Sequence, residues 1–236
     1  MIEVAGKLVD GTLIGRRARF TAMVSVGGNV MPAHLPTSSR LGELLIPDTR
    51  IILADRMRPG RLTRYDLVMV ETSSGLVSVD SLVPNRLISW ALRNSALPEF
   101  EGWSFARAEA VCGGSRFDFL LAGPKGRCWV EVKSVTLVQD GTALFPDAVT
   151  MRGARHLDEL GDAVDHGDYA AAVFVVQRGD AHRFAPNRPL DPRFADALAR
   201  AASRGVDVYA YRCRVEPGRV SIDRRIECVI DGCPGG

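Results

Sequence analysis

The sequence contains little lysine, no closely spaced cysteine pair and no long apolar run. Lysine makes up only three of the 30 basic residues (Lys7, Lys125 and Lys133), and the other 27 are arginine. The longest apolar run, residues 169–176, is far shorter than the roughly 20 residues of a membrane-spanning helix. No signal-peptide pattern is seen at the amino terminus. These absences predict a cytoplasmic protein with no membrane partner.

The cysteines and histidines form no recognisable ligand pattern. The five cysteines are odd in number and include no C-x-x-C pair, and the four histidines lie apart from them. We therefore expect neither a disulfide framework nor a zinc site. With 46% hydrophobic and 25% charged residues, the chain has the composition of an ordinary globular protein. Its 236 residues suffice for one large domain or two modest ones.

The charge is nearly balanced, but it is unevenly distributed. Residues 1–82 carry ten basic and eight acidic side chains, whereas residues 83–236 carry 20 of each. The whole net charge of +2 therefore lies in the first third, which is a weak indication of a polyanionic partner. The excess of arginine over lysine is first of all what a GC-rich genome produces.

Residues 1–82 are predicted to form a small β-barrel domain of the OB type. The turn 27–29 separates two strand-like segments, and 72–75 separates two more. The expected strands are 19–26, 30–35, 51–55, 66–71 and 76–80, with one brief helix after Ser39. Strands this short and closely spaced are typical of a small barrel.

From Pro84 onward the pattern becomes α/β, and residues 83–236 are predicted to form a second domain with a mixed central sheet. Leu87, Ile88, Ala91 and Leu92 have helical spacing. Further helices are expected at 150–164 and 192–204, the latter capped by Asp191. The expected strands are two that flank 123–126, then 170–177, 207–215 and 219–230.

The hairpin around residues 123–126 carries the chemistry. Symmetric pairing about this turn places Asp118 directly opposite Glu131, with Cβ atoms roughly 5 Å apart. Alternation puts Glu131 and Lys133 on one face and Val130 and Val132 on the other. On the same reasoning, Phe117 and Phe119 should accompany the valines into the core.

Opposed carboxylates favour a bound cation, and Mg²⁺ or Mn²⁺ is the natural choice for oxygen ligands. Such an ion activates water at a phosphate while Lys133 positions or deprotonates the nucleophile, which indicates phosphodiester cleavage. Glu109 could supply a third carboxylate. The structural alternative is an edge hairpin with a solvated polar face, on which Glu131 and Lys133 make a weak ion pair. No organic cofactor is indicated.

The predicted helix 150–164 has one polar and one apolar face. Arg152, His156 and Glu159 share the polar face. The apolar face is formed by Ala154, Leu157, Leu160 and Val164. A helix packed by its apolar face would turn Arg152 and His156 away from the core, either toward phosphates or simply into solvent.

The pattern of Asp118 followed by Glu131-Val-Lys133 resembles the PD-(D/E)xK nuclease superfamily. Five blocks in order also resemble the sugar fermentation stimulation protein A family. They are His34-Leu-Pro-Thr-Ser-Ser-Arg-Leu41, Val83-Pro-Asn-Arg-Leu87, Ser115-Arg-Phe-Asp-Phe119, Val130-Glu-Val-Lys-Ser-Val135 and Phe145-Pro-Asp-Ala-Val-Thr-Met-Arg-Gly-Ala-Arg-His-Leu157. The first block departs from the usual His-Leu-Pro-Asn-Thr-Gly-Arg, and Asp48 replaces the usual glycine after Pro47.

The resemblance implies an OB-like domain, a nuclease-like domain, DNA binding without clear sequence preference, and a regulatory role in sugar (maltose) metabolism. It assigns Asp118, Glu131, Lys133 and Glu109 to the nuclease-like site, with Asp118, Glu131 and Glu109 as metal ligands. The candidate DNA contacts are Arg16, Arg17, Arg19, Arg40, Arg116, Arg152 and His156. Folds of this kind often act as dimers, so a homodimer is one expected state.

Two functional hypotheses remain open from the sequence. In the first, the protein binds DNA with little sequence preference through arginine–phosphate contacts and retains a metal centre. In the second, it is an active metal-dependent nuclease, because a pure binding module needs no paired carboxylates facing a phosphate backbone. In a chain so rich in arginine, a lysine at position 133 favours chemistry, because lysine can give up its proton and arginine cannot.

Overall fold

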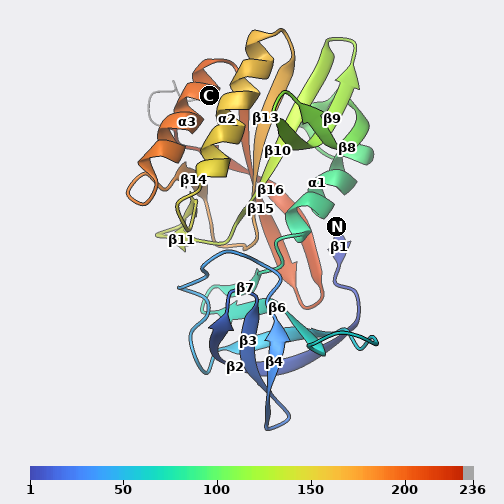
Figure 1. Cartoon of the computed structure of the whole chain (residues 1–236), viewed down its shortest axis with the longest axis vertical. Coiled ribbons are helices and arrows are strands. Elements are labelled where there is room, and N and C mark those ends of the chain that lie inside the picture. The colour runs from blue at the N-terminus through green and yellow to red at the C-terminus, as the bar shows by residue number, and fades with distance from the viewer. Residues whose placement is uncertain (231–236) are drawn as a thin grey trace.

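The computed structural model describes residues 1–230 and contains two β-sheets, one above the other in Figure 1. The smaller sheet consists of β2 (Lys7–Ala18), β3 (Thr21–Val26), β4 (Asn29–His34), β5 (Arg50–Asp55), β6 (Tyr65–Thr72) and β7 (Gly75–Ser78). Its strand order is β4-β3-β2-β5-β6-β7, and β4 also pairs with β6. That last pairing closes the sheet into the predicted OB-type barrel.

Two details of the barrel differ from the prediction. The longest strand, β2, was not expected, because its glycines and paired arginines interrupt the alternation of apolar and polar residues. Gly11 lies where an added Cβ would come within 3.0 Å of the Ser25 carbonyl oxygen, so this strand packs closely on its neighbour. The prediction of a brief helix after Ser39 is wrong. The segment makes one turn at Leu41 and stops, since Leu41 and Asp48 have φ angles of 51° and 67°.

The larger sheet is mixed, as predicted. Its strands are β1 (Ile2–Glu3), β8 (Ser104–Cys112), β9 (Ser115–Gly123), β10 (Gly126–Val135), β11 (Val138–Gln139), β12 (Thr142–Phe145), β13 (Tyr169–Val176), β14 (Arg183–Pro186), β15 (Asp207–Glu216) and β16 (Arg219–Cys228). The order is β11-β12-β14-β16-β15-β13-β10-β9-β8, and β1 pairs with β16. Strand β13 runs parallel to β10 and β15, whereas β9 runs antiparallel to its neighbours.

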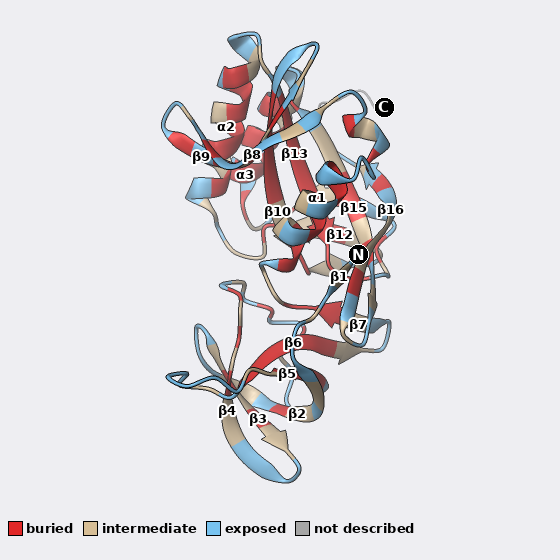
Figure 2. Ribbon diagram, turned by 90° about the vertical axis from the view of Figure 1, so that its right-hand side faces the viewer, coloured by how far each residue is buried: buried red, intermediate tan, exposed pale blue. Residues whose placement is uncertain are grey.

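Helices cover both faces of the larger sheet. The helix α1 (Val83–Arg93) packs on one face, and α2 (Met151–Asp165) and α3 (Pro192–Ser203) pack on the other, with a short 3₁₀ helix at Pro98–Phe100. Figure 2 shows that the central strands β10 and β13 are largely buried. The predicted cap is confirmed, since Asp191 accepts a hydrogen bond from the Phe194 amide. None of these helices is long and apolar enough to cross a membrane.

The barrel and the larger sheet share buried contacts. Ile52 and Met69 of the barrel belong to the same apolar cluster as Leu87 of α1 and Val132 of β10. The two-residue strand β1 joins the larger sheet, although it precedes the barrel in the chain. The predicted domain boundary after residue 82 coincides with the start of α1, and the division into two domains stays a prediction.

The four described cysteines are free thiols. The fifth, Cys233, lies outside the described residues.

Candidate functional site

The hairpin of β9 and β10 has the predicted register and then opens. Pairing runs from Gly123 with Gly126 to Phe119 with Val130. The next pair would be Asp118 with Glu131, but there the strands separate, and Asp118 Oδ2 accepts a hydrogen bond from the Val132 amide at 2.7 Å. A side chain thus takes the place of a backbone acceptor, and this opens the sheet beside two carboxylates.

The separation of the strands also corrects the prediction for the two phenylalanines. Phe119 packs with Val130 and Val132 in the cluster under α1, as expected. Phe117 instead packs with Trp129 in the cluster under α2. The reason is that β9 leaves its regular pairing with β10 at Asp118, so simple alternation does not continue through this residue.

Within residues 1–230, Asp118 has no ion-pair partner. Its Oδ1 accepts a hydrogen bond from Asn85 Nδ2 at 2.6 Å, and its Oδ2 takes the Val132 amide. Burial, together with the charge of Glu131, raises the pKa of Asp118 to about 6. The hydrogen bonds and Lys133 oppose this shift without cancelling it. At neutral pH this carboxylate is therefore ionised at a cost, which a bound cation would remove.

Glu131 is the better-compensated partner. It is 5% exposed, and its Oε1 accepts hydrogen bonds from Lys133 Nζ at 2.5 Å and from His156 Nδ1 at 2.6 Å. Burial alone would raise the pKa of Glu131, but these two hydrogen bonds and the charge of Lys133 outweigh it and lower the pKa. The two carboxylates therefore have pKa values shifted in opposite directions.

His156 differs from its predicted position. We expected the α2 helix to turn this residue away from the core, and that prediction is wrong, since His156 is 2% exposed and lies edge-on to Phe117. A carboxylate can only accept, so His156 Nδ1 donates to Glu131, and its Nε2 accepts from Arg152 Nε at 3.3 Å. Both ring nitrogens of His156 therefore have a partner at the site.

The donor set fits a hard divalent ion that keeps part of its water. Glu131 Oε2 accepts no hydrogen bond from residues 1–230, and each Asp118 oxygen retains a lone pair. Over the same residues, no group of three or more His, Cys, Asp or Glu side chains is arranged to hold a metal ion. Mg²⁺ commonly binds through one or two carboxylates plus water and substrate phosphate, so two carboxylates suffice.

Glu109 lines the same hollow as Asp118. Its position between the paired residues Ala108 and Ala110 puts it opposite Asp118, on the neighbouring strand. Its backbone is left-handed, with φ 50°, and its side chain is 71% exposed and pairs with Arg116 at 3.3 Å. A role for Glu109 as third ligand stays a prediction.

The arginines singled out from the sequence have different surroundings. Arg16 donates to the carbonyl oxygens of Ser39, Arg40 and Arg19 at 2.6 to 2.8 Å, so it holds the barrel loop in place. Arg17 and Arg19 are exposed, and Arg19 lies over the ring of Phe20. The side chains of Arg40, Arg116 and Arg152 are also exposed, the last two with the partners named above.

Sequence reasoning missed two polar residues that shape the site. Asn85, at the start of α1, donates to Asp118 from 33 residues away. Asp147 Oδ2 accepts the Arg40 amide at 2.8 Å and so joins the barrel loop to the segment that precedes α2. Both residues lie in the blocks that carry the family resemblance, which is the only signal that could have found them.

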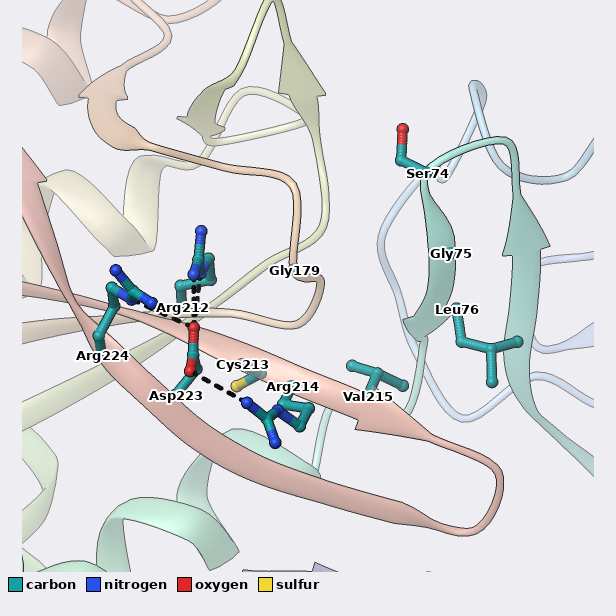
Figure 3. Close-up of a pocket in the computed structure, with 10 residues that line it drawn as sticks. All are labelled: Ser74, Gly75, Leu76, Gly179, Arg212, Cys213, Arg214, Val215, Asp223 and Arg224. Carbon is teal, nitrogen blue, oxygen red and sulfur yellow. Dashed lines mark hydrogen bonds and ion pairs between the residues drawn. The ribbon is translucent and has the colours of Figure 1, made fainter.

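A hollow of about 280 Å³ lies between β7 of the barrel and the β15–β16 hairpin. Figure 3 shows Arg212, Arg214 and Arg224 gathered around Asp223 there. Asp223 receives the shortest contact, 2.5 Å, from Arg212 Nη2. This network ties two strands together and leaves more positive than negative charge on the surface.

The barrel and the mixed sheet define the class of protein: an OB-type barrel followed by an α/β part with a mixed central sheet. Two family descriptions match the chain, "Sugar fermentation stimulation protein RE domain" over residues 82–219 and "SfsA N-terminal OB domain" over residues 14–79. The chain belongs to the sugar fermentation stimulation protein family.

Individual relatives agree with this assignment. A sugar fermentation stimulation protein homolog from Moorella thermoacetica is 45% identical over 224 residues, 94% of this chain and 97% of the relative. One from Desulforamulus reducens is 42% identical over 223 residues, 94% of this chain and 93% of the relative. The structure of Pyrococcus furiosus SfsA in complex with Ca²⁺ has a TM-score of 0.88 at 27% identity, and the match covers 98% of this chain and 100% of that one.

Proposed function

We propose that this protein binds DNA with little sequence preference and holds a divalent metal ion, Mg²⁺ or Mn²⁺, at Asp118 and Glu131. The observation that carries the proposal is the pair of opposed, largely buried carboxylates where β9 and β10 separate. The Ca²⁺ complex of the Pyrococcus furiosus relative supports it, because Ca²⁺, Mg²⁺ and Mn²⁺ all prefer oxygen ligands. The relatives are named sugar fermentation stimulation protein homologs, which supports a regulatory role in sugar (maltose) metabolism.

Each residue around the site would have a distinct role. A bound ion would neutralise phosphate charge and activate a water molecule. Asp118 and Glu131 would bind it, and Asn85 and the Val132 amide hold Asp118 in place. His156 orients Glu131 from the α2 side, which leaves Glu131 Oε2 for the ion. Lys133 Nζ, at 2.5 Å from Glu131, is the group that can position a nucleophile.

DNA contact would come from exposed arginines on both parts of the chain. Arg17 and Arg19 on the barrel and Arg116 and Arg152 beside the carboxylates keep their side chains exposed. Arginine–phosphate contacts carry no sequence information, so binding would depend on salt more than on sequence. Arg40 is the fifth candidate DNA contact. Arg16 is already bound to the barrel loop and His156 is buried, so we leave both out of the proposed contacts. Cytoplasmic location and homodimer formation stay predictions.

The second candidate function is hydrolysis of phosphodiester bonds at the same site. It is favoured by Lys133, which is part of the buried carboxylate cluster rather than of the exposed surface. A module that only binds DNA gains nothing from two carboxylates facing phosphates, since without a metal ion they would repel the backbone.

One experiment tests both functions. The wild type, Lys133→Ala and the matched control Lys125→Ala, a lysine at the exposed hairpin turn, are incubated with plasmid and single-stranded DNA in Mg²⁺, Mn²⁺ or chelator. Cleavage that needs metal and is lost only in Lys133→Ala establishes the nuclease. Mobility shifts without cleavage establish the binding protein. If the protein gives neither a mobility shift nor cleavage at low salt, both proposed functions are wrong.

A further inference from the structure

A hollow of about 480 Å³ adjoins the carboxylate site on its α1 side. Its walls come from α1, β8, β9 and the amino-terminal strand, and they include Asp118, Phe119, Trp90 and Ile2. Asp118 is thus shared between the hollow and the candidate metal site, so an occupant of the hollow would lie beside whatever group Asp118 holds. Pockets with an apolar wall and a few polar groups are the usual form of a small-ligand site.

The apolar wall of the hollow is aromatic and open. Trp90 is 44% exposed although its neighbours in the helix, Ala91 and Leu92, are buried. Two cations line the same hollow, Arg86 and Arg93, together with Glu109, whose charge is paired with Arg116. The Arg93 guanidinium lies 3.6 Å from the centre of the Phe105 ring, which holds it in place. A flat aromatic group carried on an anionic backbone matches this combination of an exposed indole and fixed guanidinium groups.

We propose that this hollow binds the base of an unpaired nucleotide, stacked on Trp90, next to a phosphate bound through the metal ion of Asp118 and Glu131. The inference rests on the proposed function and deepens it by naming the substrate class, a single-stranded or frayed nucleic acid. In a duplex the base stays in the helical stack and would have to be flipped out, at a cost of a few kcal/mol. Stacking on an aromatic side chain is tolerant of sequence, since every base has a π-face.

The test compares Trp90→Ala and Trp90→Phe with the wild type. Leu82→Ala is the matched control, because Leu82 precedes the same helix, is exposed and does not line the hollow. Each protein is titrated with a fluorescent ten-nucleotide single strand and with its duplex, in Mg²⁺ and in chelator. Tryptophan fluorescence is also followed during titration with a mononucleotide, dTMP, and with a neutral sugar, glucose.

We expect Trp90→Ala to weaken single-strand binding about tenfold, which is the usual effect of losing one stacked base, and to leave duplex binding unchanged. Trp90→Phe keeps an aromatic face, so it should retain single-strand affinity while losing the fluorescence quenching by dTMP. Equal loss for both DNA forms, no loss for either, or quenching by glucose instead of dTMP would overturn the proposal. If Trp90→Phe retains single-strand affinity, the loss in Trp90→Ala comes from lost stacking and not from misfolding.

The outcomes separate this inference from the proposed function. If DNA binding and metal dependence persist but Trp90→Ala binds both DNA forms like the wild type, the hollow is not a base site and the proposed function stands. If no protein binds DNA, the proposed function fails, and quenching by dTMP still decides whether the hollow accepts a nucleotide.

Discussion

The barrel and the larger sheet each bury carboxylates on a central strand, but they surround them with different cations. In the barrel, Asp66 on β6 is 8% exposed, and its two oxygens meet two guanidinium groups, Arg56 Nε at 3.0 Å and Arg61 Nη2. In the larger sheet, Lys133 is the cation near both Glu131 and Asp118, and Glu131 also binds the His156 imidazole. The barrel site is fully compensated by fixed charge, and the sheet site is not.

This difference separates structural from functional burial of charge. Arginine is always charged and binds a carboxylate in a fixed geometry, so Asp66 is complete without any ligand. At the opened hairpin, one ammonium faces two carboxylates, and burial together with the charge of Glu131 raises the pKa of Asp118. Buried charge that lacks a partner costs stability, and a protein keeps such a site where a ligand supplies the missing charge.

The largest expected effect concerns the barrel. Asp66→Ala removes the shared ion-pair partner of Arg56 and Arg61, which then keep only backbone carbonyl acceptors. We expect the free energy of unfolding to fall by about 3 kcal/mol, with no change in metal affinity of the folded protein. Urea unfolding and calorimetric titration with Mn²⁺ measure the two quantities. A change in metal affinity would show that the barrel site is not purely structural.

The second effect concerns the sheet. Asp118→Asn keeps the shape of the side chain but removes one of two charged ligands, so Mn²⁺ affinity should fall about 100-fold. Glu109→Gln is the matched control, because Glu109 lies on the adjacent strand with an exposed side chain. A similar loss in Glu109→Gln would establish Glu109 as a third ligand. An unchanged affinity in Asp118→Asn would remove the metal site from this hairpin.

The third effect is the pH dependence of the same site. Because the pKa of Asp118 in the folded protein is about 6, protons compete with metal below that value. Metal affinity should therefore be constant above pH 7 and about tenfold weaker at pH 5. The folded pKa lies above the unfolded one, so in the metal-free protein ionised Asp118 costs stability above pH 6, and that cost disappears as the pH falls toward 4. Titrations at pH 5 and 7.5 test this, and the dependence should vanish in Asp118→Asn.

The smallest effect returns to the barrel surface. Removing the exposed pair Arg17 and Arg19 by substitution with alanine should weaken DNA binding a few-fold and reduce the salt dependence by about two counterions. Arg16→Ala should instead loosen the loop at Ser39 and Arg40, because its guanidinium is bound to that loop. Fluorescence anisotropy between 50 and 200 mM salt measures the slope. If Arg16→Ala weakened DNA binding more than removal of Arg17 and Arg19, Arg16 would be the phosphate contact and not a residue that only holds the loop.

The local features of this chain could be predicted from its sequence. The hairpin register from Gly123 with Gly126 to Phe119 with Val130 follows from a tight turn and the two-residue alternation of strands. The helices α1 and α3 follow from apolar spacing and a proline at the start of each, and α3 also from its Asp191 cap. The strand β2 could not be predicted in the same way, since its Gly11 is explained only by the close approach of Ser25 from another strand.

The composition of the site, by contrast, was decided by the tertiary structure. Sequence alone determined which residues could carry the chemistry, Asp118, Glu131 and Lys133, because hairpin geometry acts over neighbouring residues. The fold decided that Asn85 holds Asp118, that His156 points inward to Glu131, and that Arg16 serves a loop rather than a phosphate. Those contacts join residues 23 to 33 positions apart. At such separations, packing of whole elements, and not local periodicity, sets which side chains meet.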